Sequence, residues 1–349
     1  MRTFPATSIV ILVAVVSGFG TKLGLISYAR GLQQPSSPTQ QRPEKKSPQS
    51  EQKRPEEPAQ NQEETIHLSS HLVLVPVSAS DANGNPVTNL TARDIVIEEQ
   101  GRPQQVVSLG EPGKTPIDLA LLFDVSGSTM RQFDFERQAA EQFVKRDLKP
   151  GDDISIFAIG ATPKMIQART NAIADAIAGL NSIEPANVPT AFFDTVIAGV
   201  QYLGKTADAE SRRVVLVISD GEENYSTTGT LSQSLRDLQK NDCLFYSINP
   251  NGHGVKLNKI SQQGQAVMES MASETGGKAF SISRPEDLES VFNEIAAELQ
   301  AQYLFGYYAD DQATDTGFKK ITVRAPGRPD IRIRARQGYY PSLQPAPKP

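Results

Sequence analysis

Residues 117–130 read Ile117-Asp118-Leu119-Ala120-Leu121-Leu122-Phe123-Asp124-Val125-Ser126-Gly127-Ser128-Thr129-Met130, and this segment is the main evidence for the fold class. The unbroken apolar run 119–123 is typical of a strand buried on both faces, and a helical pattern follows over 131–147. Asp124, Ser126 and Ser128 therefore fall at the carboxyl end of a strand, the edge where open α/β sheets bind ligands. Oxygen side chains at this spacing suit a hard divalent cation such as Mg²⁺.

A simpler interpretation is that Asp124 ends the strand and a serine caps the next helix. Two distant segments favour the cation site instead. A second apolar run, 214–219, ends in Asp220-Gly221, and Thr190 lies in a turn directly before an apolar-periodic helix. The complete pattern is Asp-x-Ser-x-Ser, then Thr, then Asp-Gly, supplied by three separate loops.

This pattern resembles the metal-ion-dependent adhesion site of the von Willebrand factor type A domain, over roughly residues 116–300. The resemblance implies that the serines and the threonine coordinate the metal, while the aspartates bind it directly or through water. Pro189 precedes the threonine, where the family often has glycine. The implied ion is Mg²⁺, with Mn²⁺ or Ca²⁺ as alternatives. The implied ligands are Asp124, Ser126, Ser128, Thr190 and Asp220, and the candidates for a rim that selects the ligand are Arg131, Glu222, Glu223 and Asn224.

Composition sets limits on the class of protein. The chain has 349 residues, which is room for about two domains. Its net charge of −5 lacks the basic footprint that nucleic-acid binding needs. The single cysteine, Cys243, excludes an intrachain disulfide, and its apolar run 243–248 predicts a buried structural thiol.

The amino-terminal region predicts export. Residues 1–29 have the pattern of a signal peptide, with a basic start, an apolar core and the cleavage-type sequence Ser27-Tyr28-Ala29. The protein is therefore expected to be periplasmic, at the cell surface or secreted, and attached to a membrane only if this segment stays uncleaved. Residues 30–65 are rich in proline, glutamine and charge and predict a disordered linker, and 342–349 predict a disordered tail.

Both flanks of the central region predict β-strands. The expected strands before it are 71–79, 95–99 and 105–109, the last two forming a hairpin around the tight turn 100–103; those after it are 303–308, 320–324 and 331–335. We expect segments 66–113 and 301–341 to form one small β-sandwich. The motifs at 87–94 and 334–341 resemble the bacterial family of Acidobacterial type related to the von Willebrand factor type A domain.

The central region, 114–300, predicts a doubly wound, mostly parallel, Rossmann-like α/β domain inserted in that sandwich. After the first strand and helix, further strands are expected at 153–160, 164–168 (an edge strand), 214–219, 243–248 and 278–282. Helices are expected at 171–180, 191–203, 231–241, 264–275 and 285–300.

Other chemistries for this sheet edge lack their residues. The turn after the first strand has one glycine, Gly127, so neither a dinucleotide fingerprint nor a P-loop is present. Aspartyl-phosphate hydrolases have Asp-x-Asp in this turn, and here the second position is Ser126, which is no proton-transfer group. The histidines His67, His71 and His253 do not form a hydrolase pattern with a serine. We expect no enzyme activity and no nucleotide cofactor.

The resemblance implies an ion with one open coordination position, which an acidic side chain of another protein fills. We therefore expect an exported bacterial protein that binds a partner protein through a divalent cation. The alternative is an envelope assembly scaffold or subunit, in which the metal site is structural or vestigial and the β-sandwich makes the contacts.

Overall fold

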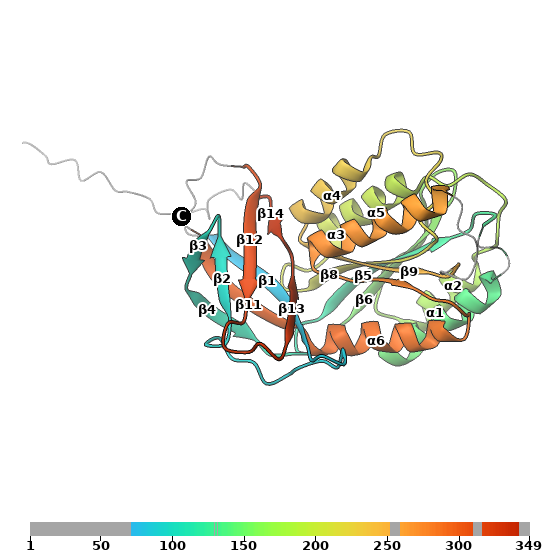
Figure 1. Ribbon diagram of the computed structural model, residues 1–349. Helices are drawn as coiled ribbons and strands as arrows, with labels where there is room; N and C mark the ends of the chain where they lie inside the picture. Colours follow the sequence, from blue (N-terminus) through green and yellow to red (C-terminus); the bar gives the residue numbers. More distant parts are fainter. Residues whose placement is uncertain (1–70, 129, 131, 252–258, 310–315, 342–349) are drawn as a thin grey trace, which may run out of the picture. The chain divides into compact units, whose positions relative to one another are not determined.

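The computed structural model describes residues 71–128, 130, 132–251, 259–309 and 316–341 (Figure 1). The predicted signal peptide, linker and tail lie outside these residues, as do His67, His253 and Arg131. None of the helices in the described ranges is long and apolar enough to cross a membrane.

A six-stranded sheet forms the centre of the α/β domain, in the order β10-β9-β8-β5-β6-β7. All neighbouring strands are parallel except β7, which pairs antiparallel with β6 at the edge, as expected for 164–168. The interior strand β5 is apolar on both faces because helices cover both. The bounds are β5 (Ile117–Asp124), β6 (Asp153–Ile159), β7 (Lys164–Thr170), β8 (Arg212–Ile218), β9 (Cys243–Asn249) and β10 (Ala279–Ser281).

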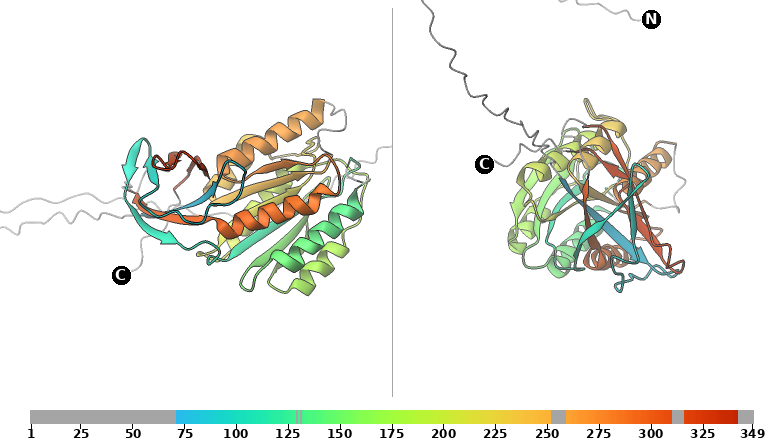
Figure 2. Two further views of the ribbon diagram at one scale, coloured as in Figure 1. Left: turned by 60° about the horizontal axis from the view of Figure 1, so that its bottom comes forward. Right: turned by 90° about the vertical axis from the view of Figure 1, so that its left-hand side faces the viewer.

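Helices cover the two faces of this sheet as separate layers (Figures 1 and 2). One layer holds α1 (Phe133–Asp147), α2 (Ile173–Asn181) and α6 (Asp287–Ala301); the other holds α3 (Phe192–Thr206), α4 (Leu231–Lys240) and α5 (Lys259–Thr275). Alternate residues of β5 point into different layers: Leu121 packs with the first and Leu122 with the second. Helix α5 begins at Lys259, five residues before the start expected at Gly264.

The flanking segments form two antiparallel sheets, ordered β13-β1-β11-β4 and β14-β12-β2-β3. Each sheet joins strands from both ends of the chain, for example Val75 opposite Phe305 and Ile97 opposite Val323. The bounds are β1 (His71–Ser80), β2 (Val96–Glu99), β3 (Arg102–Gln104), β4 (Val106–Gly110), β11 (Tyr303–Ala309), β12 (Lys319–Arg324), β13 (Arg332–Ala335) and β14 (Gly338–Tyr339).

The hairpin expected between 95–99 and 105–109 is wrong. Strand β2 pairs instead with β3, across a two-residue turn in which Gln100 and Gly101 have φ of 49° and 78°. Two positive φ values match the twist of a tight hairpin. The chain then crosses to the other sheet, where β4 pairs with β11. Pro103 is tolerated in β3 because this strand is at the edge of its sheet.

One hydrophobic core lies between the two flanking sheets and is separate from the two cores of the α/β domain. It takes inward side chains from both sheets, including Val75 and Phe305 from one and Ile97 and Ile321 from the other. This confirms an α/β fold with a mostly parallel sheet accompanied by a β-sandwich from both flanks. The expected domain limits at 66–113, 114–300 and 301–341 stay predictions.

Candidate metal site

Asp124 ends β5 and is fully buried, and hydrogen bonds from Ser126 and Ser219 hold its carboxylate in place. The Ser126 N–H donates to Oδ1 over 2.8 Å, and the Ser219 hydroxyl donates to Oδ2 over 2.5 Å. Burial raises the pKa of Asp124 to about 6, the hydrogen bonds from Ser219 and Ser126 act against this, and the negative charge of Asp220 adds to it. This carboxylate is therefore fixed in position and attracts positive charge.

The two serines of the motif meet at their hydroxyl groups, with 3.1 Å between Ser126 Oγ and Ser128 Oγ. The residue between them packs closely against the loop that leads to Thr190. A Cβ atom on Gly127 would lie 2.5 Å from Asn187 Oδ1. Glycine at this position therefore lets the two loops approach each other.

Thr190 is buried and is bound to the loop after β8 through its backbone. Its N–H donates to Asn224 Oδ1 over 2.8 Å, and its carbonyl accepts hydrogen bonds from the N–H groups of Asn224 and Tyr225 over 3.1 Å. Asp220 is the second residue of the same loop. The loop from Asp220 to Tyr225 thus carries one candidate ligand and positions another.

Asp220 is buried and connects further segments of the site. Its carboxylate accepts hydrogen bonds from the Glu222 N–H over 3.1 Å and from Asn251 Nδ2 over 3.0 Å, and it also bonds to Ser128. Burial is the main cause that raises the pKa of Asp220. Hydrogen bonds therefore link Asp124, Ser126, Ser128 and Asp220 directly, and Thr190 joins them through the loop after β8.

Two of the expected rim residues hold loops together. The Glu223 carboxylate accepts hydrogen bonds from Phe193 at the start of α3 and from Tyr225 and Ser226 in its own loop. Asn224 holds Thr190 as described. A role of Glu222, Glu223 or Asn224 in selecting a ligand stays a prediction, as does that of Arg131, outside the described residues.

Three residues in or near the site were not singled out from the sequence. In the sequence, Ser219 stands out only as the polar end of an apolar run. In the structure, its hydroxyl donates a hydrogen bond to Asp124. Glu136 was marked by a carboxylate in an otherwise apolar helix stripe, and it is fully buried. Asn251, which donates to Asp220, carries no local signal, because its contact depends on the meeting of two distant loops.

The donor set fits a hard divalent cation. It combines hydroxyl oxygens with two buried carboxylates whose pKa values are raised, and Mg²⁺, Mn²⁺ and Ca²⁺ all prefer such oxygen ligands. The carboxylates would supply charge to the ion, and the hydroxyl groups would supply neutral ligands.

A second group of acids lies at the opposite end of the strands, but an arginine side chain already pairs with its members. Asp118, Asp153 and Asp208 place carboxylate oxygens within 4.8 Å of one another. Arg169 forms ion pairs with them over 2.6, 2.7 and 2.7 Å respectively. This group is an arginine-centred ion network that ties β5, β6 and β7 together.

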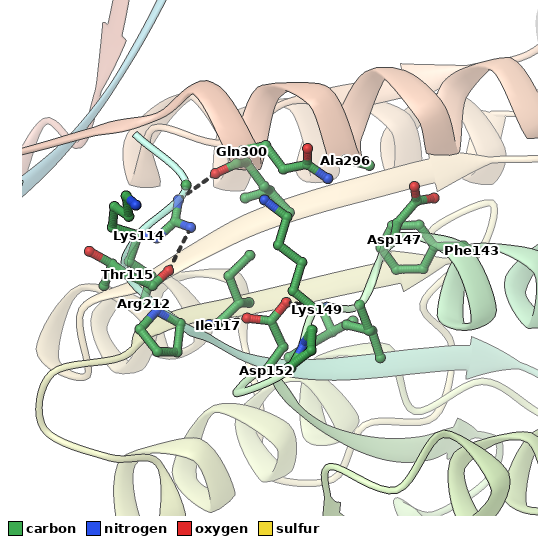
Figure 3. A pocket seen from close by; sticks show the side chains of 16 residues that line it. Lys114, Thr115, Ile117, Phe143, Asp147, Lys149, Asp152, Arg212, Ala296 and Gln300 are labelled. Atoms are coloured by element: carbon green, nitrogen blue, oxygen red, sulfur yellow. Dashed lines mark hydrogen bonds between the residues drawn. The ribbon is translucent and has the colours of Figure 1, made fainter. Parts of the chain in front are cut away.

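A pocket of about 70 Å³ lies at the amino end of β5, between α1 and α6 (Figure 3). Arg212 crosses its wall and donates to the carbonyls of Thr115 over 3.0 Å and Leu299 over 2.7 Å. Ile117 lines this pocket and Asp124 ends the same strand, so the pocket and the candidate metal site occupy opposite ends of β5.

The fold and the site together define an α/β protein with an oxygen-rich candidate cation site at the carboxyl edge of a mostly parallel sheet. The chain belongs to the von Willebrand factor type A domain family, whose family model matches residues 118–294. A comparison with curated protein sequences found no match.

Several solved structures are similar to the chain at low sequence identity. Proximal thread matrix protein 1 from the mussel byssus, with a zinc-occupied MIDAS motif, is 16% identical with a TM-score of 0.46, over 58% of this chain and 50% of that one. A von Willebrand factor type A protein from Catenulispora acidiphila is 14% identical with a TM-score of 0.45, over 66% and 50%. BatB from Bacteroides thetaiotaomicron is 14% identical with a TM-score of 0.40, over 52% and 97%. The chain thus spans about half the length of the mussel protein.

Proposed function

We propose that this chain is an exported bacterial protein of the Acidobacterial type that binds a partner protein through a divalent cation. Mg²⁺ is the expected ion. The observation that carries the proposal is the hydrogen-bonded group of Asp124, Ser126, Ser128 and Asp220 at the sheet edge, with Thr190 on the adjoining loop. The proposed ligands are Asp124, Ser126, Ser128, Thr190 and Asp220.

The partner is proposed to supply an acidic side chain. Hydroxyl ligands leave a hard ion's shell of about six oxygens incomplete, and a carboxylate from outside completes it. Met130 and Tyr225 are 48% and 51% exposed; Met130 is two residues after Ser128, and the Tyr225 N–H bonds to Thr190. Methionine and tyrosine are enriched at protein interfaces. A partner with an acidic residue beside apolar side chains fits this surface.

Binding rather than catalysis is proposed for the same residues. Ser126 stands where a hydrolase that uses Asp124 as nucleophile would need a second acid, and Asp124 is already bonded to Ser219. The site has the hydroxyl and carboxylate oxygens that an ion-mediated contact needs.

Calorimetric titration of the chain with MgCl₂, MnCl₂ and CaCl₂ tests the cation site. We expect one divalent site that Asp124→Ala removes, because the fixed carboxylate supplies charge to the ion. Asp175→Ala, which removes an exposed carboxylate from α2, is the matched control and should bind normally. Undiminished affinity in Asp124→Ala would show that the ion binds elsewhere.

A scaffold role remains the second candidate, and one surface favours it. Leu72, Val107 and Tyr308 are 41%, 47% and 51% exposed on three adjacent strands, with Leu72 directly opposite Tyr308. Exposed apolar side chains grouped on one sheet face are typical of a contact surface. A pull-down from the native envelope with and without EDTA separates the two candidates, because only ion-mediated contacts disappear on chelation.

A further inference from the structure

Glu136 occupies a position in α1 where an apolar residue is the normal choice. The buried residues of this helix are Phe133, Glu136, Ala140, Phe143 and Val144, which form the stripe that faces the sheet. The Phe133 ring packs edge-on against Phe123, with 5.4 Å between ring centroids, and Phe123 directly precedes Asp124. Glu136 therefore places a carboxylate beneath the carboxyl end of β5, at 0% exposure.

This carboxylate has no hydrogen-bond partner among the described residues. Both of its oxygens are buried and unpaired, whereas the buried carboxylates of Asp118, Asp124 and Asp220 each accept several hydrogen bonds. An unpaired buried carboxylate is costly to a fold. Among the nearby acids of the described chain, Glu136 is thus the one that the protein itself does not satisfy.

The charged groups that act on Glu136 locate it beside the candidate metal site. Burial raises its pKa to about 8, and the negative charges of Asp124 and Asp220 add to this. Glu136 forms no hydrogen bond with either aspartate, so the charges of the two aspartates act on it through space. Three acids therefore converge on one buried region from α1, β5 and the loop after β8.

We propose that Glu136 is a sixth residue of the cation site, whose carboxylate accepts hydrogen bonds from water bound to the ion. This inference rests on the proposed cation site. The water-mediated role follows because Glu136 is fully buried and forms no hydrogen bond with either aspartate, while Ser128 is exposed. Groups that hold a metal's outer shell commonly change its affinity 10- to 100-fold.

Glu136 is therefore a positioning residue that stabilises the loaded state and destabilises the metal-free state. In the metal-free state Glu136 is a buried carboxyl group without hydrogen-bond donors beside two other acids, and this is unfavourable. A divalent cation relieves that cost. Replacement of the Glu136 carboxyl should consequently have opposite effects on the two states. A carboxylate that merely fills the core would change the stability of the protein without changing its affinity for cations.

The test compares Glu136→Gln with the unsubstituted chain. The affinity for Mn²⁺ is measured by electron paramagnetic resonance of the free ion, and the melting temperature is measured in EDTA. We expect Glu136→Gln to bind Mn²⁺ about 10- to 100-fold more weakly. In EDTA its melting temperature should rise, because the substitution removes a buried carboxyl group that has no hydrogen-bond partner among the described residues.

Glu141→Gln is the matched control, because it makes the same change on the same helix at a residue paired with Lys145. It should leave Mn²⁺ affinity unchanged. If the glutamine variant does not fold, Glu136→Met tests the same loss of charge with a side chain that suits the apolar stripe. Unchanged Mn²⁺ affinity in a folded Glu136 variant overturns the inference.

The result also separates this inference from the proposed function. If the unsubstituted chain binds no Mn²⁺, the proposed cation site fails and the inference fails with it. If the unsubstituted chain binds Mn²⁺ and Asp124→Ala does not, the cation site stands and the affinity of the Glu136 variant alone decides the inference.

Discussion

At the scale of single residues, the partners of each buried acid separate two kinds of environment. Asp118 is buried against the guanidinium of Arg169, so its charge is compensated by the protein. Asp124 is buried against hydroxyl and amide donors, and the negative charge of Asp220 lies nearby. Structural acids and candidate ligand-binding acids thus differ in what faces them, although the residue type is the same.

Replacement of Arg169 by methionine should strongly destabilise the protein. The substitution leaves Asp118, 1% exposed, without its positive partner, and breaking a buried ion pair costs about 3 kcal/mol or more. Urea unfolding of Arg169→Met measures the loss. Arg328→Met is the control, because Arg328 pairs with the exposed Asp330 and its loss should leave stability nearly unchanged. Equal unfolding midpoints for the two variants would contradict the structural role of the network.

Cys243 should be unreactive in the folded protein. Burial raises the pKa of its thiol well above the ordinary value, and only the thiolate is an effective nucleophile. We expect no reaction with Ellman's reagent at pH 8 until a denaturant is added, when one thiol per chain should react. Rapid labelling of the native protein would mean that β9 opens readily.

At the scale of secondary-structure elements, the candidate site depends on how tightly the loop after β8 approaches α5. Gly221 has a φ of 73°, and a Cβ atom there would lie 2.8 Å from the backbone oxygen of Gly264 in α5. Glycine at both positions lets the backbones meet directly after Asp220. The helix packing therefore determines where this candidate ligand lies.

Gly221→Ala should destabilise the protein and weaken cation binding together. The side chain would meet both an unfavourable φ and a backbone contact, with a cost of about 2–4 kcal/mol. Thermal unfolding and Mn²⁺ titration measure the two effects. Gly327→Ala is the control, because an added Cβ there has no neighbour within 4 Å and should change neither property. A Gly221→Ala variant of normal stability would show that the loop shifts without cost.

At the scale of the whole molecule, the α/β domain and the flanking sheets have separate cores but share polar contacts. Glu298 of α6 forms hydrogen bonds with Ser78 of β1 over 3.1 Å and with Tyr246 of β9 over 2.5 Å, and it pairs with Arg334 of β13. Gln302 bonds to both Arg212 and Ser78. These contacts hold the end of α6 against the strands of the α/β domain and against the flanking sheets.

A chain that spans only residues 114–300 should fold by itself, because both α/β cores consist of residues within it. It should melt cooperatively, at a lower temperature than the full chain because contacts such as Glu298–Arg334 are lost. The fragment 66–112 should not fold, since β1, β2 and β4 pair with strands that it lacks. A cooperative melt of the 66–112 fragment, followed by circular dichroism, would contradict this organisation.

Local sequence patterns were enough to predict the strands of the α/β domain, their alternation with helices and the position of Asp124, Ser126 and Ser128 at a strand end. It could do so because apolar runs and their periods reflect local burial. The same reasoning located the flanking strands, since β1, β11 and β12 carry strand-type patterns. These features depend on residues that are near one another along the chain.

Which distant segments meet became visible only in the folded structure. The partner of β2, the hydrogen bond from Ser219 to Asp124, the contact of Asn251 with Asp220 and the burial of Glu136 all join residues from separate elements. A hydroxyl or amide side chain has the same local pattern whether it faces water or a buried carboxylate. Its role therefore depends on the packing of distant loops and helices, which no local period encodes.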